Sequence, residues 1–205
     1  MEQIPAYIAA LQETINRLPV HLIAKVVKVL QDARLGGRQV FIMGNGGSAS
    51  TATHFVCDLA KNTRRDGLPH YRVIGLTDNM AIFSAYANDE GYESVFASQL
   101  ANLIHDEDIV IGISASGNSP NVIRGMEEAR KHNAITIGFT GYDGGGLGAM
   151  VDLHIHVKSD VIEHVEDIHL MLEHMIVKTI KETGDSRMIL SEQVMKYSVG
   201  VSGDK

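Results

Sequence analysis

Residues 40–50 read VFIMGNGGSAS, an apolar run that ends in three closely spaced glycines and two serines. The apolar residues before Gly44 predict a buried strand, and the glycines allow the backbone to turn tightly after it. A helix is expected over residues 48–62, where His54 and Asp58 lie four residues apart and therefore share one face. This strand, turn and helix predict an α/β fold with a ligand bound beside the turn.

The remaining sequence continues the same alternation. Three more apolar runs, at residues 71–77, 108–114 and 134–140, resemble the first and are also predicted to be buried parallel strands. A fifth segment, at 152–157, alternates between apolar and polar residues and is expected at an edge of the sheet. Helical stretches separate them at 79–103 (in two pieces), 119–132, 145–150 and 160–183. This rhythm predicts a doubly wound, mainly parallel five-stranded sheet flanked by helices.

Residues 1–37 carry two amphipathic stripes, which predict an N-terminal helix pair that covers the sheet or contacts another subunit. No linker, repeat or low-complexity segment divides the chain. We therefore expect one domain over 1–205, with the helix pair at 1–37, an α/β core at 38–183 and a C-terminal tail at 184–205. A last short helix is expected within that tail.

Composition narrows the class of protein. The chain has 205 residues, 44% hydrophobic and 21% charged, with a formal net charge of −7 and a single cysteine. Without a basic stripe, no direct nucleic-acid partner is expected. No apolar run reaches the ~20 residues of a membrane span, and no signal peptide is recognised. One cysteine excludes an internal disulfide, so we expect a soluble protein of the cytoplasm with no membrane partner.

A second loop, SASGNSPN at 114–121, follows the strand predicted over 108–114. Three hydroxyls lie within six residues, at Ser114, Ser116 and Ser119, and Ser119-Pro120 is typical of a helix start. Free amides at that helix end would suit a phosphate monoester. An ordinary serine-rich turn is the alternative interpretation.

A dinucleotide site is a further alternative. Gly44-x-Gly46-x-x-Ala49 satisfies the general form of the dinucleotide-binding fingerprint. That fingerprint also needs an acidic residue about 20 positions later, whereas the second predicted strand ends at Asp78. An oxidoreductase is therefore the weakest of the functions considered.

Four ordered blocks give the chain a family resemblance: GNGGSA (44–49) with HFVCDL (54–59), ANDEGYESVFASQL (87–100), ISASGNSPNVI (113–123) and EDIHLMLEH (166–174). On these blocks the chain resembles the SIS (sugar isomerase) domain family, and within it the phosphoheptose isomerase group. The resemblance implies an aldose–ketose isomerase that converts sedoheptulose 7-phosphate to glycero-manno-heptose 7-phosphate through an enediol. It also implies a homotetramer.

The resemblance further implies site residues. The implied substrate contacts are Asn45, Gly46, Gly47, Ser48, Asn88, Asp89, Ser114, Ala115, Ser116, Ser119 and Glu166. The implied metal ligands are His54, Asp58, Glu166 and His174, of which Asp58, Glu166 and His174 are also implied to be catalytic. Two imidazoles and two carboxylates suit Zn²⁺, and Mn²⁺, Fe²⁺ or Ni²⁺ as well.

Three positions depart from the family pattern. Ala115 replaces a threonine, Asp58 a glutamate and Glu166 a glutamine. The two acidic changes leave open a second function, a non-catalytic phosphosugar-binding protein of the kind that assists a replication initiator. His164 and His169 also lie on the last predicted helix, and we expect both to be structural.

Overall fold

A computed structural model of the chain describes residues 2–183. A five-stranded parallel sheet forms its centre, with strand order β2-β1-β3-β4-β5. The strands are β1 (Gln39–Gly44), β2 (Arg72–Gly75), β3 (Ile109–Ser114), β4 (Ile135–Thr140) and β5 (Leu153–His156). The doubly wound sheet is thus confirmed, with the alternating fifth strand at an edge. The predicted tail at 184–205 lies outside the described residues.

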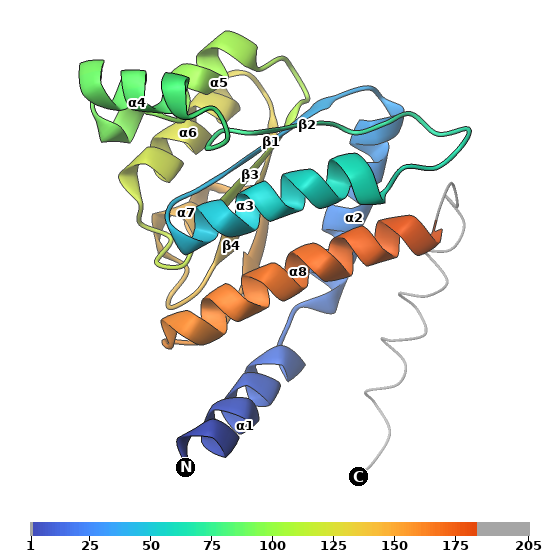
Figure 1. Ribbon diagram of the computed structural model, residues 1–205, viewed down its shortest axis with the longest axis vertical. Coiled ribbons are helices and arrows are strands. Elements are labelled where there is room, and N and C mark those ends of the chain that lie inside the picture. The colour runs from blue at the N-terminus through green and yellow to red at the C-terminus, as the bar shows by residue number, and fades with distance from the viewer. Residues whose placement is uncertain (1, 184–205) are drawn as a thin grey trace.

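Helices cover both faces of the sheet (Figure 1). The described α-helices are α1 (Gln3–Asn16), α2 (Val20–Leu35), α3 (Gly47–Cys57), α4 (Met80–Asp89), α5 (Ala97–Leu103), α6 (Pro120–Lys131), α7 (Gly145–Met150) and α8 (Ile162–Thr183). Of these, α1 extends away from the sheet beyond α8 (Figure 1). One buried apolar cluster packs α2, α3 and α8 against the sheet, and a second packs α5, α6 and α7 on the other face. No helix within residues 2–183 combines the length and apolar character needed to cross a membrane.

The helix after β1 does not stay α-helical. α3 continues into one π-helical turn, η1 (Asp58–Asn62), and a short 3₁₀ turn, η2 (Tyr92–Ser94), separates α4 from α5. Sequence predicted one continuous helix over 48–62 and did not indicate the wider turn. π-helical turns occur frequently at functional sites.

α3 and α8 both start at the carboxyl edge of the sheet and run side by side toward the amino edge (Figure 1). We call the line of contact between α3–η1 and α8 the seam. Both helices bury apolar side chains on the sheet, among them Phe55 of α3 and Leu172 of α8. Residues that face each other across the seam are therefore held on two well-packed elements.

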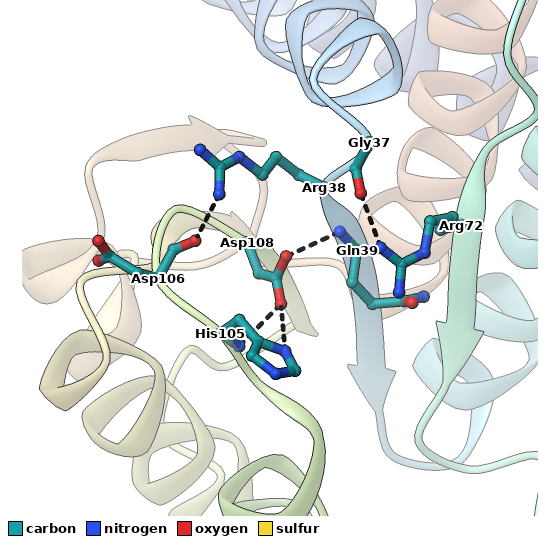
Figure 2. Close-up of polar contacts among 7 residues, drawn as sticks. All are labelled: Gly37, Arg38, Gln39, Arg72, His105, Asp106 and Asp108. Carbon is teal, nitrogen blue, oxygen red and sulfur yellow. Dashed lines mark hydrogen bonds and ion pairs between the residues drawn. The ribbon is translucent and has the colours of Figure 1, made fainter.

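At the amino edge, Asp108 fastens the starts of β1 and β3 together (Figure 2). Its carboxylate is 3% exposed and accepts hydrogen bonds from the backbone amides of Gln39 and His105, at 2.8 and 2.9 Å. Arg72 donates to the carbonyl of Gly37, and Arg38 to the carbonyl of Asp106. These charged groups are thus used in holding the sheet together.

Candidate functional site

The two loops singled out in the sequence leave the sheet at its topological switch point. The chain moves from β1 outward to β2 and then returns to β3 on the other side of β1. Gly44 pairs with Ile113, so the two strands end at the same level. In doubly wound sheets this divergence opens a crevice at the carboxyl ends, where ligands bind.

The glycine turn between β1 and α3 needs its glycines for two separate reasons. Gly46 has φ +54° and ψ −121°, a conformation that residues with side chains rarely adopt. A Cβ on Gly47 would lie 2.5 Å from Oε1 of Glu166, which is closer than real contacts allow. The turn therefore lets the Glu166 carboxylate of α8 come directly against the backbone.

The loop after β3 brings two of its three hydroxyls together. The Ser114 and Ser119 oxygens lie 3.1 Å apart, and Ser116 Oγ accepts from the amide of Asn118 at 3.2 Å. Ser119 is at the N-cap with Pro120 at N1, as predicted, but its hydroxyl makes no capping hydrogen bond. The hydroxyl instead faces Ser114 at the helix start, where an anion is favoured.

Two asparagines connect these loops. The Asn45 and Asn121 side chains exchange a pair of hydrogen bonds, both at 2.8 Å, and Tyr92 also donates to Asn45 at 2.9 Å. Because Asn45 lies in the glycine turn and Asn121 in the first turn of α6, the bonds fix the two loops relative to each other. Sequence comparison had singled out Asn45 but not Asn121 or Tyr92.

A cavity of about 680 Å³ opens beside the glycine turn. Its described lining comes from the turn, from one face of α3 and from the segment around α4: Gly44, Asn45, Gly46, Ala49, Ser50, Thr53, His54, Cys57, Thr77, Met80, Phe83 and Tyr92. The expected residues Asn45, Gly46 and His54 thus share one hollow. The three loop serines are not among the described residues that line it. Their loop is joined to the glycine turn, which does line it, by the hydrogen bonds between Asn45 and Asn121.

Halfway along the seam, four titratable side chains meet: His54 and Asp58 from α3–η1, Glu173 and His174 from α8. One ligand atom from each lies within 4.8 Å of all the others. The two imidazoles have Nε2 atoms 3.4 Å apart and cross nearly edge-on, with centroids 5.0 Å apart. We call these residues the carboxylate–imidazole group. Both histidines are half exposed, so the group is open to a ligand.

Glu173 is the most constrained member of this group. Its carboxyl is fully buried, and neither oxygen has a hydrogen-bond partner among the described residues. Burial, and secondarily the nearby Asp58 carboxylate, raise the pKa of Glu173 to about 8. His174 Nε2 lies 3.3 Å from Glu173 Oε2, and Asn62 donates to Asp58 Oδ1 at 2.7 Å. A buried carboxyl without a donor is a place where a cation would be stabilised.

Glu166, implied as a metal ligand, is not a member of the group. Eight residues separate it from His174, which along an α-helix is about 12 Å. It therefore lies one level higher on the seam, at Gly47, whereas His174 faces His54. Glu173 takes the fourth position instead. The sequence analysis placed Glu166 and His174 on one side of the helix but did not take into account the distance between them along the helix axis.

The other expected residues have simpler surroundings. Asn88 and Asp89 are exposed at the end of α4 and bond to each other at 2.7 Å. His164 packs edge-on against Tyr7, and His169 lies beside the ring of Phe139. Both histidines are buried, consistent with the structural role expected for them.

The chain is similar to known proteins both in sequence and in structure. The sequence model of one family, the SIS domain, matches residues 5–141. A phosphoheptose isomerase of Roseiflexus sp. is 37% identical over 185 residues, which are 89% of this chain and 92% of that protein. A probable phosphoheptose isomerase of Thermoplasma acidophilum is 37% identical over 80% of this chain and 90% of its own.

The fold is similar to that of solved relatives. A phosphoheptose isomerase structure from Francisella tularensis superposes with a TM-score of 0.80 at 33% identity, covering 88% of this chain and 97% of that one. Both the family match and the identities extend over more than half of the chain. The chain therefore belongs to the SIS domain family, as the four sequence blocks indicated.

Proposed function

We propose that the chain is an aldose–ketose isomerase that converts sedoheptulose 7-phosphate to glycero-manno-heptose 7-phosphate. The names of relatives at 37% identity support this substrate. The observation that carries the proposal is the carboxylate–imidazole group, because His54 belongs both to it and to the 680 Å³ cavity. The site thus offers acids, bases and a hollow for a sugar.

The reaction moves a proton between C1 and C2 and shifts a second proton between the two oxygens. Two carboxyls in different environments suit this task, since one can accept a proton while the other holds one. Asp58, partly exposed and bonded to Asn62, is assigned as the base that takes the carbon-bound proton. His174 and His54 are assigned to the sugar oxygens, with Glu173 orienting His174 from its buried side.

A divalent metal, with Zn²⁺ as our first expectation, fits the same group. His54, Asp58, Glu173 and His174 would hold it, and the donor set of two imidazoles and two carboxylates is one that Zn²⁺ accepts. The unpartnered Glu173 carboxyl supports this assignment over the one with Glu166. When bound, such an ion polarises a carbonyl oxygen as a Lewis acid.

The remaining substrate contacts are assigned by position. Ser114, Ser116, Ser119 and the backbone of Ala115 would take the phosphate, with the sugar extending past Asn45, Gly46, Gly47 and Ser48 toward His54. Glu166, which lies at Gly47, would contact a sugar hydroxyl rather than a metal. Asn88 and Asp89 are kept as contacts of the distal end. Holding the phosphate at one loop positions the reacting carbons at the other.

We further propose that the protein acts as a homotetramer in the cytoplasm. α1 leaves Ile4 and Ile8 exposed, at 67% and 50%, on the stripe predicted to meet another subunit. Cys57 is free and exposed, which suits a reducing compartment. Light scattering after size exclusion should give four chains, and a monomer would contradict the assembly.

The activity is tested by incubating metal-loaded protein with sedoheptulose 7-phosphate and separating the products by chromatography. A panel of five-, six- and seven-carbon ketose phosphates in the same assay fixes the chain length. Turnover is expected for the seven-carbon substrate. If none of the panel is converted while phosphosugars still raise the melting temperature, the non-catalytic binding function replaces the proposal.

A further inference from the structure

A second cavity lies at the other end of the seam. It measures about 150 Å³ and is formed where α2, the segment after η1 and α8 end together. Its described lining includes four cationic side chains, from Arg34, Arg64, Arg65 and Lys181, and the polar side chains of Asn62 and Thr63. We call it the basic pocket. No acidic residue is among the described residues that line it, although the chain carries a net charge of −7.

Arg34 is the residue of the basic pocket that would be stabilised most by a bound anion. The residue is only 5% exposed, and its Nη2 is buried without a hydrogen-bond partner. Nε donates to the carbonyl of Pro69, and the guanidinium lies 5.2 Å from the centre of the Tyr71 ring. A guanidinium stays charged at all ordinary pH values, so its burial without a counter-ion is costly. An anion in the pocket would remove that cost.

The other three cations are also available. Within residues 2–183, Arg64, Arg65 and Lys181 form no ion pair with a carboxylate, in contrast to Lys28, Lys131 and Lys178. Arg38 and Arg72, at the same edge of the sheet, are already bonded to backbone carbonyls (Figure 2). The basic pocket therefore concentrates the unpaired positive charge of this edge.

Size and shape select the kind of anion. A cavity of about 150 Å³ holds several water molecules, and so has room for a tetrahedral oxyanion but not for a whole sugar phosphate. Arginine side chains present several donors in a planar fork that matches phosphate oxygens. We propose that the basic pocket is a second anion site, separate from the sugar site, that takes inorganic phosphate or the phosphate group of a monoester.

Equilibrium dialysis of the full chain with labelled inorganic phosphate, at constant ionic strength, tests the proposal. Arg64→Gln/Arg65→Gln removes two exposed cations, and Lys25→Gln/Lys131→Gln removes two others outside the pocket as the matched control. We expect the first variant to bind one phosphate per chain fewer than the wild type, or at least tenfold more weakly. The control should bind as the wild type does. Equal binding by both variants would overturn the proposal.

Ser119→Ala distinguishes phosphate bound at the sugar site from phosphate bound in the basic pocket. This variant should weaken phosphate binding at the loop after β3 only. Loss in Ser119→Ala with normal binding in Arg64→Gln/Arg65→Gln would leave the sugar site as the sole anion site and overturn the proposal. Failure of the isomerase assay does not affect this result, because the readout is phosphate stoichiometry. In Ser119→Ala, glycerol 3-phosphate is then added to compete with labelled phosphate at the basic pocket. Competition would mean that the pocket also takes a phosphate monoester, and lack of competition that it takes inorganic phosphate alone; both results support a second anion site.

A chemical measurement needs no variant. Phenylglyoxal modifies accessible arginines, and peptide mass spectrometry locates them. Phosphate should slow modification of Arg64 and Arg65 severalfold while leaving the exposed Arg17 unchanged. Uniform protection of all three would indicate an ionic-strength effect, and no protection at Arg64 and Arg65 would contradict the pocket.

Discussion

The two halves of the seam have opposite chemistry, although η1 and α8 contribute residues to both. Midway along it, Asp58 and Glu173 place two carboxyls beside two imidazoles. One to two turns further on, Arg64, Arg65 and Lys181 gather around the buried Arg34. One half therefore favours a cation and the other an anion. One line of helix contact would thereby serve both proposed sites, because each level of the contact has its own side chains.

Substitution of His174, in the carboxylate–imidazole half, is expected to have the largest effect on turnover. His174→Ala should lower kcat about 10²–10⁴-fold, since a positioned acid or base contributes that much, while phosphosugar affinity changes little. Steady-state kinetics and calorimetric binding measure the two quantities. Lys178→Ala, on the exposed side of the same helix and outside both halves, should keep wild-type turnover. Equal loss of binding and turnover in His174→Ala would instead indicate a folding defect.

The pH dependence of stability tests α8, which both halves share, through its buried His169. Desolvation lowers the pKa of the buried His169 to about 4, and the Thr140 backbone opposes this only in part. Between pH 6.5 and 4 the unfolded chain takes up a proton at His169 that the folded chain excludes, so the contribution of His169 to stability falls as pH falls. This contribution amounts to a loss of about 2 kcal/mol between pH 7.5 and 5. Glu173, whose pKa is raised to about 8, acts in the opposite direction over the same range, so the effect of His169 is measured as a difference between wild type and variant.

Urea denaturation across this pH range measures the effect. Relative to the wild type, His169→Gln should lack the loss of about 2 kcal/mol between pH 7.5 and 5, whatever its effect on stability at neutral pH. An unchanged slope in the variant would contradict the assignment to His169.

Metal affinity tests whether Glu173 or Glu166, which lie at different levels of the seam, is the metal ligand. Glu173→Gln removes a carboxylate from the carboxylate–imidazole group and should weaken Zn²⁺ binding at least tenfold, about 1.4 kcal/mol. Glu166→Gln, at the level of Gly47, should change it less than twofold. Titration against a competing chelator, with elemental analysis of the purified protein, gives both values. The reverse order of effects would restore Glu166 as the ligand.

Asn62 touches both halves, which gives the smallest and most specific prediction. Its amide donates to Asp58 and its side chain lines the basic pocket. Asn62→Ala should lower kcat about fivefold by removing a hydrogen bond to a carboxylate, with KM nearly unchanged. Phosphate at concentrations that fill the pocket should alter kcat in the wild type but not in this variant. An identical response in both proteins would mean that the halves are independent.

Much of the fold was predictable because its signals are local. Buried parallel strands appear as apolar runs, and the paired stripes on α1 and α2 have helical spacing. The glycine turn and the serine loop were recognisable from composition and then from their order along the chain. The π-helical turn at Asp58–Asn62 was not, since its residues are ordinary helix formers.

Two charged residues that sequence analysis missed, Glu173 and Arg34, have one property in common. Glu173 follows Leu172 and precedes Ile176 and Val177 on the buried stripe of α8, and Arg34 follows Ala33 on that of α2. A charged residue at a buried position of a helix is itself a signal of a binding or ion-pairing role, because charged side chains are rarely buried without a partner. The pattern of buried positions on one helix cannot predict which residue from elsewhere in the chain will contact it. His54, which lies 120 residues from His174 in the sequence, is such a residue.

α8 supplies half of the carboxylate–imidazole group from the last described element, beyond the residues 5–141 that match the family. A nascent chain that has left the ribosome up to residue 160 already contains all five described strands and both ligand loops. It lacks Glu173 and His174, and also the side chains of α8 that belong to the core, such as Leu172. The proposed chemistry therefore has to wait until α8 has been made and packed.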